Sequence, residues 1–467
     1  MIHTSDTICA LSTPSGSGAI GVIRLSGSKA IALANSIFKG KNLEQQKGQT
    51  LHFGKIVNEE EVLDEVLISL FKGPNSYTGE DTIEISCHGS SYIVAKVLEL
   101  LLKKGAKLAK PGEFTMRSFM NGKMDLAQAE AVGDLIAAES KAAHGLALNQ
   151  MRGGFSKKIA DLRHELIQFT ALIELELDFA EEDVEFANRS DLKDLVNNLS
   201  EMIKGLLNSF STGNVMKNGI PVAIVGQPNV GKSTLLNALL NEDKAIVSEI
   251  AGTTRDSIED EVKIGGIAFR FIDTAGIRET TDVVENIGIQ RTFQMVEKAN
   301  VVLYLVDVVM DTKEEIHQVI SAIQAKIEGK EKQLIVLANK ADKADFDADD
   351  VPEEFSSKFP KGIEPIYLSA LKKLRLEKLT ATLEEIAKTT LNSGSDVVVS
   401  NLRHYEALKS AGEALARVQN GLDTNITGDF LAMDIRQALH YLGEITGTIE
   451  IDRDILGIIF SQFCIGK

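Results

Sequence analysis

The sequence has 467 residues, of which 67 are acidic and 50 are basic, so its formal net charge is −17. It contains no apolar run of about 18 residues, and its first residues lack the basic and apolar regions of a signal peptide, so we expect a cytoplasmic protein without a membrane partner. The three cysteines are too dispersed for a disulfide framework or a zinc site. The acidic balance also argues against general nucleic-acid binding, because neutralising phosphates requires Lys and Arg.

The length predicts about three domains, the first of which is an α+β domain at residues 1–120. Apolar and polar residues alternate along 81–88, which places Ile83, Ile85 and Cys87 on one face of a strand. The same domain is predicted to contain two further strands and a helix, at residues 19–26, 62–71 and 91–103.

The period changes at about residue 121, where an all-α domain is predicted to begin. Its first part spans 121–215 and carries an amphipathic helical stripe of Leu162, Leu166, Phe169, Ile173 and Leu177. The Ala-rich segment Met124–Leu148 predicts one continuous helix, and residues 213–219 are interpreted as a linker. The acidic run at 178–185 favours a solvated loop over a metal site.

Residues 216–385 alternate apolar runs with helical patterns, which predicts an inserted α/β domain with a mostly parallel sheet. Its strand candidates are residues 221–226, 301–307, 334–339 and 363–369. Helical periodicity returns in residues 386–467, at 402–418 and 430–445. The whole is therefore predicted to be a multidomain α/β protein in which a P-loop domain splits one helical domain.

The segment Gly226–Ser233 (GQPNVGKS) follows a predicted strand and opens a helix, which is the context that a P-loop requires. Its glycines let backbone N–H groups turn toward phosphates, and the helix N-terminus adds its dipole. Lys232 is expected to neutralise the β- and γ-phosphates, and the Ser233 hydroxyl to hold Mg²⁺. The predicted phosphate-binding residues here are Asn229, Val230, Gly231, Lys232, Ser233 and Thr234.

Four further elements follow in the order expected of a GTP-binding domain. Thr254, in Gly-Thr-Thr-Arg-Asp, and Asp273, in Asp-Thr-Ala-Gly, are predicted to serve Mg²⁺ and the γ-phosphate. In Asn-Lys-Ala-Asp, Asp342 can accept hydrogen bonds from guanine N1 and N2, which adenine cannot offer. A backbone N–H of Ser369-Ala370 can meet guanine O6. The predicted binding residues of the last three elements are Asp273, Thr274, Ala275, Gly276, Asn339, Lys340, Asp342, Ser369 and Ala370.

The residue that would position the attacking water is not evident from these motifs. Ile277 follows Asp-Thr-Ala-Gly directly and has no polar group with which to orient water. Either hydrolysis is slow, or one of four nearby charged residues acts: Arg278, Glu279, Asp282 or Glu285.

With these motifs in place, the sequence resembles the tRNA modification GTPase family called MnmE or TrmE along essentially its full length. The more specific shared segments are Gly73–Asp81 (GPNSYTGED), Pro111–Thr115 (PGEFT), Lys123–Glu130 (KMDLAQAE) and Phe463–Lys467 (FCIGK). The resemblance implies GTP- and folate-dependent modification of C5 of the wobble uridine in certain tRNAs, of the carboxymethylaminomethyl or aminomethyl type. It also implies a homodimer formed through the N-terminal domain and a partner, MnmG (GidA), that uses FAD and NADH.

The resemblance further implies site residues that spacing alone does not reveal. A potassium ion would replace an arginine finger, with Asn229, Ser248, Ile250 and Thr253 among its ligands, in a loop formed by Ser248, Glu249, Ile250, Ala251, Gly252, Thr253 and Thr254. Glu285 matches the water-orienting glutamate of the family. The N-terminal domain resembles folate-dependent aminomethyl carriers, which implies that a tetrahydrofolate derivative (5,10-methylene or formyl form) contacts Arg24, Glu80, Lys123 and Lys467.

Two features remain open at this point. Cys464 can be a buried apolar residue or a reactive, catalytic thiol near the folate, whereas Gly466 and Lys467 disfavour a prenylation signal. The segment Lys96–Lys123 has seven basic and two acidic residues, so it is either a local tRNA-binding face or an ordinary exposed segment.

The favoured function is a potassium-stimulated GTPase in tRNA modification. Two alternatives are a ribosome-assembly GTPase switch and a folate-dependent aminomethyl transfer protein with a regulatory GTP domain. Under the favoured function, the acidic total means that any tRNA contact must be local.

Overall fold

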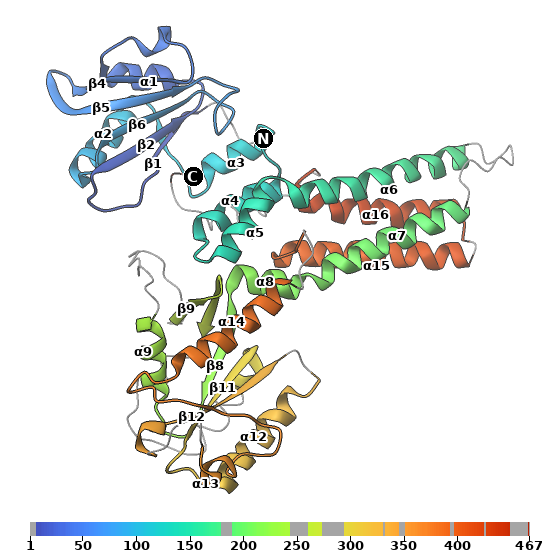
Figure 1. The fold of residues 1–467 in the computed structure, drawn as a ribbon. Helices are drawn as coiled ribbons and strands as arrows, with labels where there is room; N and C mark the ends of the chain where they lie inside the picture. Colours follow the sequence, from blue (N-terminus) through green and yellow to red (C-terminus); the bar gives the residue numbers. More distant parts are fainter. Residues whose placement is uncertain are drawn as a thin grey trace. The chain divides into compact units, whose positions relative to one another are not determined.

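The computed structural model describes residues 6–178, 189–242, 260–272, 294–329, 332–344, 351–392, 397–424, 426–448 and 466. The chain, drawn in Figure 1, divides into two compact units. The first comprises Met1–Ile136, Ala147–Lys204 and Glu406–Lys467, and the second comprises Ala137–Leu146 and Gly205–Tyr405.

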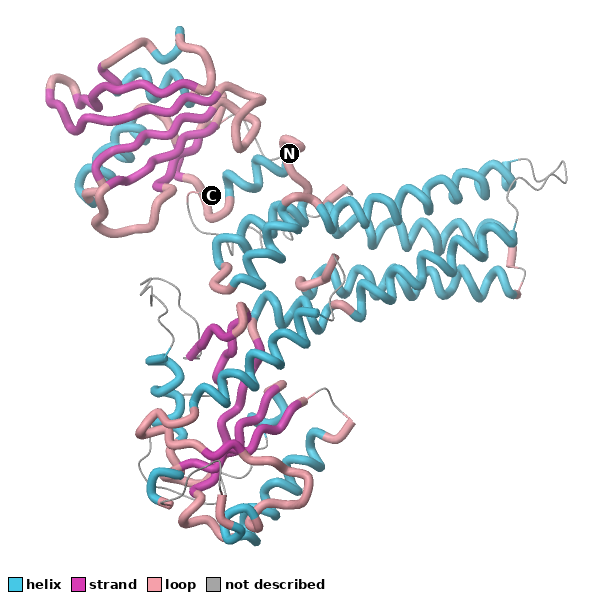
Figure 2. The backbone as a smooth tube through the Cα atoms, viewed as in Figure 1, coloured by secondary structure: helices cyan, strands magenta, loops and turns pink. Residues whose placement is uncertain are grey.

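The first unit begins with a seven-stranded sheet in the order β3-β4-β5-β6-β2-β1-β7 (Figure 2). Neighbouring strands are antiparallel except for the parallel pair β1–β7. The three predicted strands and the predicted helix are present. The strands are β1 (Ile8–Leu11), β2 (Ile20–Ser26), β3 (Phe38–Lys39), β4 (Thr50–Asn58), β5 (Glu61–Phe71), β6 (Thr82–His88) and β7 (Lys107–Leu108).

The two faces of this sheet differ in chemistry. Helices α1 (Ala30–Ile37) and α2 (Ser91–Lys103) pack on one face, where Ile83, Ile85 and Cys87 are buried as the alternation predicted. Strand alternation places Arg24 on the opposite face, where Phe114 of α3 (Glu113–Met120) belongs to a small apolar cluster. A polar site can therefore form on the α3 side without entering the main core.

Most of the remaining helices of this unit form a bundle in which α6 packs against α16. Leu162 and Leu166 on α6 are buried, as the helical stripe predicted. Among the described helices, none combines the length and apolar character that a bilayer crossing needs. The bundle helices are α6 (Gly154–Asp178), α7 (Arg189–Asn208), α15 (Leu402–Asp423) and α16 (Gly428–Thr446), whereas α4 (Leu126–Ala137) buries Leu126 and Ala129 against α3.

The prediction of one helix over Met124–Leu148 was wrong, because α4 ends at Ala137 and α5 (Lys141–Met151) begins anew. Ser140 separates the two helices. Its hydroxyl accepts a hydrogen bond from the N–H of Ala143 at 3.1 Å, as an N-cap does. A polar side chain that satisfies the first N–H groups of a new helix favours a break even within an Ala-rich run.

The second unit contains a six-stranded sheet in the order β13-β12-β11-β8-β10-β9, parallel except for the antiparallel pair β9–β10. The predicted, mostly parallel sheet is therefore confirmed, although 363–369 contributes a strand of only two residues. The strands are β8 (Ile220–Val225), β9 (Asp260–Ile264), β10 (Ile267–Phe271), β11 (Val301–Asp307), β12 (Gln333–Asn339) and β13 (Ile366–Tyr367).

Both faces of this sheet are covered, as the continuous apolar strands require. Helices α9 (Lys232–Glu242) and α14 (Leu376–Asn392) bury leucines on one face, and α12 (Lys313–Ile327) buries isoleucines on the other. Because all the strands except β9 run parallel, their carboxyl ends lie at one common edge of the sheet, where the predicted nucleotide motifs lie.

The interpretation of 213–219 as a linker was also wrong, because α8 spans Phe210–Asn218. A Cβ at Gly213 would lie 2.1 Å from the carbonyl oxygen of Val399, so this glycine permits close packing rather than flexibility. The helix ends at Gly219, whose φ of +80° favours glycine.

We predict that Gly213→Ala lowers the free energy of unfolding by about 1–3 kcal/mol, because the added methyl group collides with the backbone of Val399. Gly205→Ala is the matched control, since a Cβ there meets nothing within 4 Å. The control should raise stability by up to about 1 kcal/mol. Urea unfolding measures both, and equal effects of the two variants would contradict the close packing.

Candidate functional site

The P-loop follows β8 and ends in the first turn of α9. Gly226 has a φ of +154°, and a Cβ there would lie 2.4 Å from the carbonyl oxygen of Leu305. Gly231 has a φ of +105°, and its Cβ would lie 2.4 Å from Nδ2 of Asn339. Both positions therefore require glycine, and the loop is pressed against the ends of neighbouring strands.

Lys232 lies at the start of α9 with its ammonium group folded back over the loop. The Nζ atom donates to the carbonyl oxygens of Gly226 at 2.7 Å and Gln227 at 2.9 Å. Burial lowers the pKa of Lys232, because the charged form loses hydration. A phosphate group near this ammonium would replace the lost hydration, as P-loop chemistry requires.

Asn339 connects the P-loop to the base-recognition segments. Its Nδ2 donates to the carbonyl oxygen of Val230 at 2.7 Å, and its Oδ1 accepts from the N–H of Ala370 at 3.0 Å. The residue is 3% exposed. The structure thus brings together the phosphate-binding and guanine-binding segments that the sequence predicted separately.

The predicted guanine contacts lie beside this junction. Asp342 is exposed on a 3₁₀ turn (Ala341–Lys343), and the N–H of Ala341 donates to the carbonyl oxygen of Leu368 at 3.2 Å. The N–H groups of Ser369 and Ala370 already donate to Leu374 and Asn339. A guanine O6 atom would therefore share a donor with a protein acceptor.

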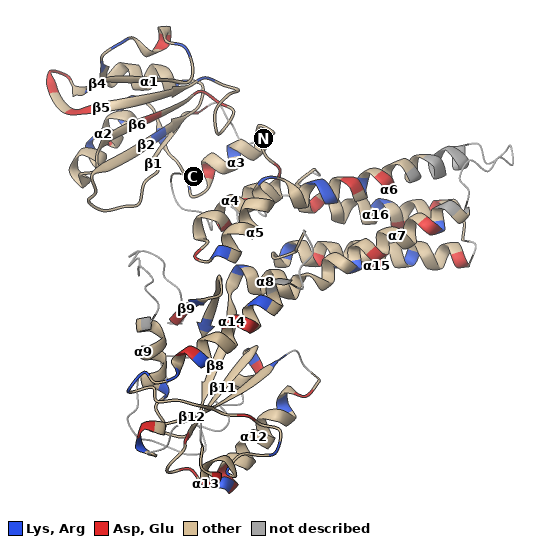
Figure 3. Cartoon of the chain, in the orientation of Figure 1, with Lys and Arg blue, Asp and Glu red and all other residues tan. Residues whose placement is uncertain are grey.

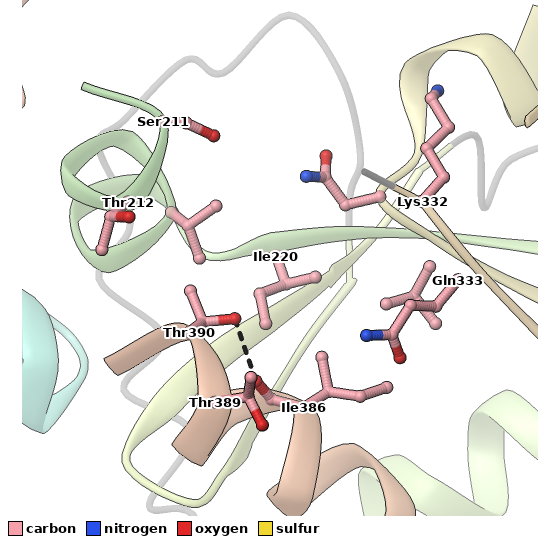
Figure 4. A pocket seen from close by; sticks show the side chains of 11 residues that line it. Ser211, Thr212, Ile220, Lys332, Gln333, Ile386, Thr389 and Thr390 are labelled. Carbon is pink, nitrogen blue, oxygen red and sulfur yellow. Dashed lines mark hydrogen bonds between the residues drawn. The ribbon is translucent and has the colours of Figure 1, made fainter. Parts of the chain in front are cut away.

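A separate cavity of about 440 Å³ lies where β8, β11 and β12 begin, at the sheet edge opposite the nucleotide motifs (Figure 4). Its lining includes the polar side chains of Ser211, Asn300, Gln333 and Thr390. The Thr390 hydroxyl donates to the carbonyl oxygen of Ile386 in its own helix. None of the residues that line this cavity is a predicted nucleotide-binding residue.

In the first unit, the predicted folate residues Arg24 and Glu80 lie on the sheet face that bears α3. Arg24 pairs with Glu84 at 2.8 Å, and its guanidinium lies 5.2 Å from the ring centroid of Tyr77 and 5.6 Å from that of Phe114. These separations are typical of cation–π contacts. Arg24 is thus held by a carboxylate and two aromatic rings rather than being loose surface charge.

Glu80 belongs to a buried network centred on Arg117, whose side chain is 2% exposed. The guanidinium contacts Glu113 at 2.9 Å, Asp6 at 2.8 Å and Glu80 at 3.3 Å. Glu80 also accepts a hydrogen bond from the Ser26 hydroxyl at 2.7 Å. Burial on its own lowers the pKa of Arg117, but the carboxylates of Glu113 and Glu80 raise it above its ordinary value.

The role of Arg117 was not predicted from the sequence, where this residue is one of seven basic residues in Lys96–Lys123. The spacing of Glu113 and Arg117, four residues apart on one helix, was the available signal for an ion pair.

The structure also places Lys123 and the neighbour of Lys467 in the chain, Gly466. Lys123 donates to the carbonyl oxygen of Pro74 at 2.9 Å. The carbonyl oxygen of Gly466 accepts from the Ser12 hydroxyl at 2.9 Å, so Gly466 lies at the end of β1. Burial raises the pKa of Cys9 and Cys87 to about 11, which makes both poor nucleophiles.

Several predictions lie outside the described residues. They are Ser248, Glu249, Ile250, Ala251, Gly252, Thr253, Thr254, Asp273, Thr274, Ala275, Gly276, Arg278, Glu279, Asp282, Glu285, Cys464 and Lys467.

The comparisons with known proteins agree with the motifs. Residues 126–464 match the family described as MnmE helical domain, and residues 7–123 match GTP-binding protein TrmE N-terminus. The chain belongs to the MnmE (TrmE) family. Two proteins named tRNA modification GTPase MnmE, from Christiangramia forsetii and Bacteroides thetaiotaomicron, are 55% and 54% identical, each with 99% coverage of both chains.

A crystal structure of Aquifex aeolicus Era bound to GDP.AlF4⁻ is 31% identical over 42% of this chain and 66% of that chain. Its TM-score of 0.28 supports no structural argument.

The basic segment of this MnmE family member is partly neutralised by acidic residues of the protein. Lys96 and Lys103 both pair with Glu99, and Lys107 pairs with Asp6. Arg117 is buried and pairs with Asp6, Glu80 and Glu113. Four of the seven basic residues therefore have acidic partners. Both charge types also occur along α6, α7 and α15 (Figure 3). The segment is therefore a weaker phosphate-binding face than its composition indicated.

We predict that Arg117→Met lowers the free energy of unfolding by about 3–5 kcal/mol, because it leaves partly buried carboxylates without their cation. Lys104→Ala, on the exposed end of α2, is the control and should change stability by less than about 0.5 kcal/mol. Urea unfolding of the two variants tests this, and a stability loss for Arg117→Met no larger than that of the control would rule out the network as a stabilising element.

Proposed function

We propose that this chain hydrolyses GTP in the modification of tRNA. The observation that carries the proposal is the junction at Asn339, which joins the P-loop to the Asn-Lys-Ala-Asp segment. Family membership along nearly the whole chain supports the tRNA-modifying role. Asp342, with its exposed carboxylate, would recognise the N1 and N2 groups of guanine.

The residues of the P-loop suit a magnesium nucleotide. Lys232 and the loop N–H groups would bind the β- and γ-phosphates, and Ser233, in the first turn of α9, offers the hydroxyl oxygen that Mg²⁺ favours. When bound, Mg²⁺ neutralises charge on the phosphates. Among the described residues, no group of three or more His, Cys, Asp or Glu forms a rival metal site. Thr254 and Asp273 are the further magnesium residues in this proposal.

We predict that Lys232→Ala reduces GTP hydrolysis about 100-fold or more, because it removes a donor aimed at the transferred phosphoryl group. Lys361→Ala removes an exposed lysine of the same unit and should leave turnover unchanged. Phosphate release from GTP measures both variants. Unchanged turnover in Lys232→Ala would exclude the P-loop role.

Potassium stimulation and water activation extend the proposal. Asn229, whose φ is +61° within the P-loop, would be one K⁺ ligand together with loop residues 248–254. The cation would supply the positive charge that an arginine finger supplies elsewhere. Glu285 would orient the attacking water.

We predict faster GTP turnover in KCl than in NaCl at equal ionic strength, because only the larger cation would match the proposed ligand set. Glu285→Ala should retain GTP affinity and lose hydrolysis. Equal rates in the two salts would refute the potassium role. Normal turnover of the Glu285 variant would transfer the water-orienting role to Glu279 or Asp282.

We further propose that the N-terminal domain binds a tetrahydrofolate derivative through Arg24, Glu80, Lys123 and Lys467, with Cys464 nearby. The contacts of Arg24 and Glu80 on one sheet face support a polar site there. The same domain would form a homodimer. Leu51, Phe53 and Leu67, which are 59%, 65% and 42% exposed on β4 and β5, support such an apolar contact.

In this proposal, the protein acts in the cytoplasm with MnmG, which would supply FAD and NADH chemistry at the wobble uridine. The N-terminal, first helical, GTP-binding and second helical parts would be residues 1–120, 121–215, 216–385 and 386–467.

A further inference from the structure

A buried ion pair lies beside the P-loop, and its carboxylate belongs to none of the nucleotide motifs. Asp307, the last residue of β11, places Oδ2 at 2.6 Å from Nζ of Lys340. The Asp307 side chain is 6% exposed, whereas that of Lys340 is 27% exposed. A pair this short and this shielded from water is stronger than a surface salt bridge.

The ammonium group of Lys340 makes a second contact, to the P-loop itself. It donates to the carbonyl oxygen of Asn229 at 2.8 Å. The adjacent Asn339 donates to the next carbonyl, that of Val230, at 2.7 Å. Two consecutive side chains of the base-recognition segment therefore hold two consecutive peptide groups of the phosphate-binding loop.

Asn229 and Lys340 themselves both have left-handed backbone conformations that such contacts can support. Asn229 has a φ of +61° and Lys340 a φ of +65°, values that non-glycine residues adopt at a cost. The ion pair and the carbonyl contact together restrain both strained residues.

Asp307 is itself fixed on its other side. Its Oδ1 accepts from the N–H groups of Val309 at 3.1 Å and Met310 at 3.3 Å. Its own N–H donates to Oδ2 of Asp311 at 2.8 Å. Burial on its own would raise the pKa of Asp307, but the hydrogen bonds from Lys340 and the two N–H groups lower it, so the carboxylate is ionised at neutral pH.

We propose that Asp307 is a positioning residue for nucleotide binding. Its carboxylate holds the Lys340 ammonium against the Asn229 carbonyl, so that the phosphate-binding and base-recognition loops are aligned before a nucleotide arrives. Preorganisation of this kind lowers the cost of ordering a site on binding. Asp307 touches neither phosphate nor base in this proposal, so it should affect affinity and nucleotide release more than the hydrolysis step.

The test uses the full-length chain with the variant Asp307→Asn. The asparagine keeps the shape and can still accept the Val309 and Met310 N–H groups, but it removes the charge that faces Lys340. We expect the Kd values for radiolabelled GTP and GDP to rise about tenfold, mainly through faster dissociation, because the charge-assisted bond is lost. The value of kcat at saturating GTP should change by less than about twofold, well below the change in affinity.

Asp311→Asn is the matched control. Asp311 is a buried aspartate in the same turn, and its carboxylate contacts the N–H of Asp307 rather than Lys340. We expect its nucleotide affinity to remain within about twofold of that of the unmodified protein, well below the effect of a lost charge-assisted bond. Equal losses of affinity in the two variants would overturn the proposal, because they would reflect a general disturbance of the turn.

A double-mutant cycle keeps the test decisive if Asp307→Asn lowers stability. If Asp307 acts through Lys340, adding Asp307→Asn to Lys340→Met should weaken binding no further, whereas additive losses would overturn the proposal. The proposal rests on the GTP-binding function. Failure of the unmodified protein to bind guanine nucleotides would refute that function, whereas normal binding with an unaffected Asp307→Asn variant would refute only the positioning role.

Discussion

The nucleotide site depends on one buried amide, the side chain of Asn339. Its two polar atoms satisfy the carbonyl of Val230 and the N–H of Ala370, which are far from each other in the sequence. Leaving any of these buried groups without a partner would cost about 1–3 kcal/mol. Gly231 permits this junction, because any side chain there would collide with the amide. The P-loop is therefore shaped by the neighbouring strand end as well as by its own sequence.

The first unit uses the same principle with charges instead of amides. Arg117 gathers carboxylates from Asp6, Glu80 and Glu113, three positions separated along the chain. Lys107 also pairs with Asp6, so two cations face three carboxylates and the cluster carries a net negative charge near the sheet face that bears Arg24. Arg24 lies outside the cluster and pairs instead with Glu84. The face thus holds two separate cation–carboxylate groups in fixed positions, which is the kind of rigid polar surface that an organic cofactor can use.

Local patterns predicted the elements and motifs that depend on local chemistry. The alternation at 81–88 identified β6, and the spacing of GQPNVGKS identified a loop that indeed joins β8 to α9. The predictions were wrong or incomplete where tertiary contacts determine the local structure. Gly213 looks like a flexible linker residue, but its lack of a side chain accommodates Val399. Arg117 looks like one of several surface cations, and although its spacing from Glu113 indicates one ion pair, only the fold shows Asp6 and Glu80 beside it. Asp307 has no motif at all, because its role comes from its position at a strand end beside Lys340.

If GTP binding at this site serves tRNA modification, the modified nucleosides of cellular tRNA report on that link directly. The measurement is the content of C5-modified wobble uridine in tRNA from cells that lack the protein and are complemented with the unmodified gene or with Lys232→Ala. We expect the modification to disappear without the protein, to return with the unmodified gene and not to return with the variant. Full modification in cells that lack the protein would contradict it. In that case, a defect in ribosome assembly, or in aminomethyl transfer to another acceptor, would identify which other function the GTP-binding site serves.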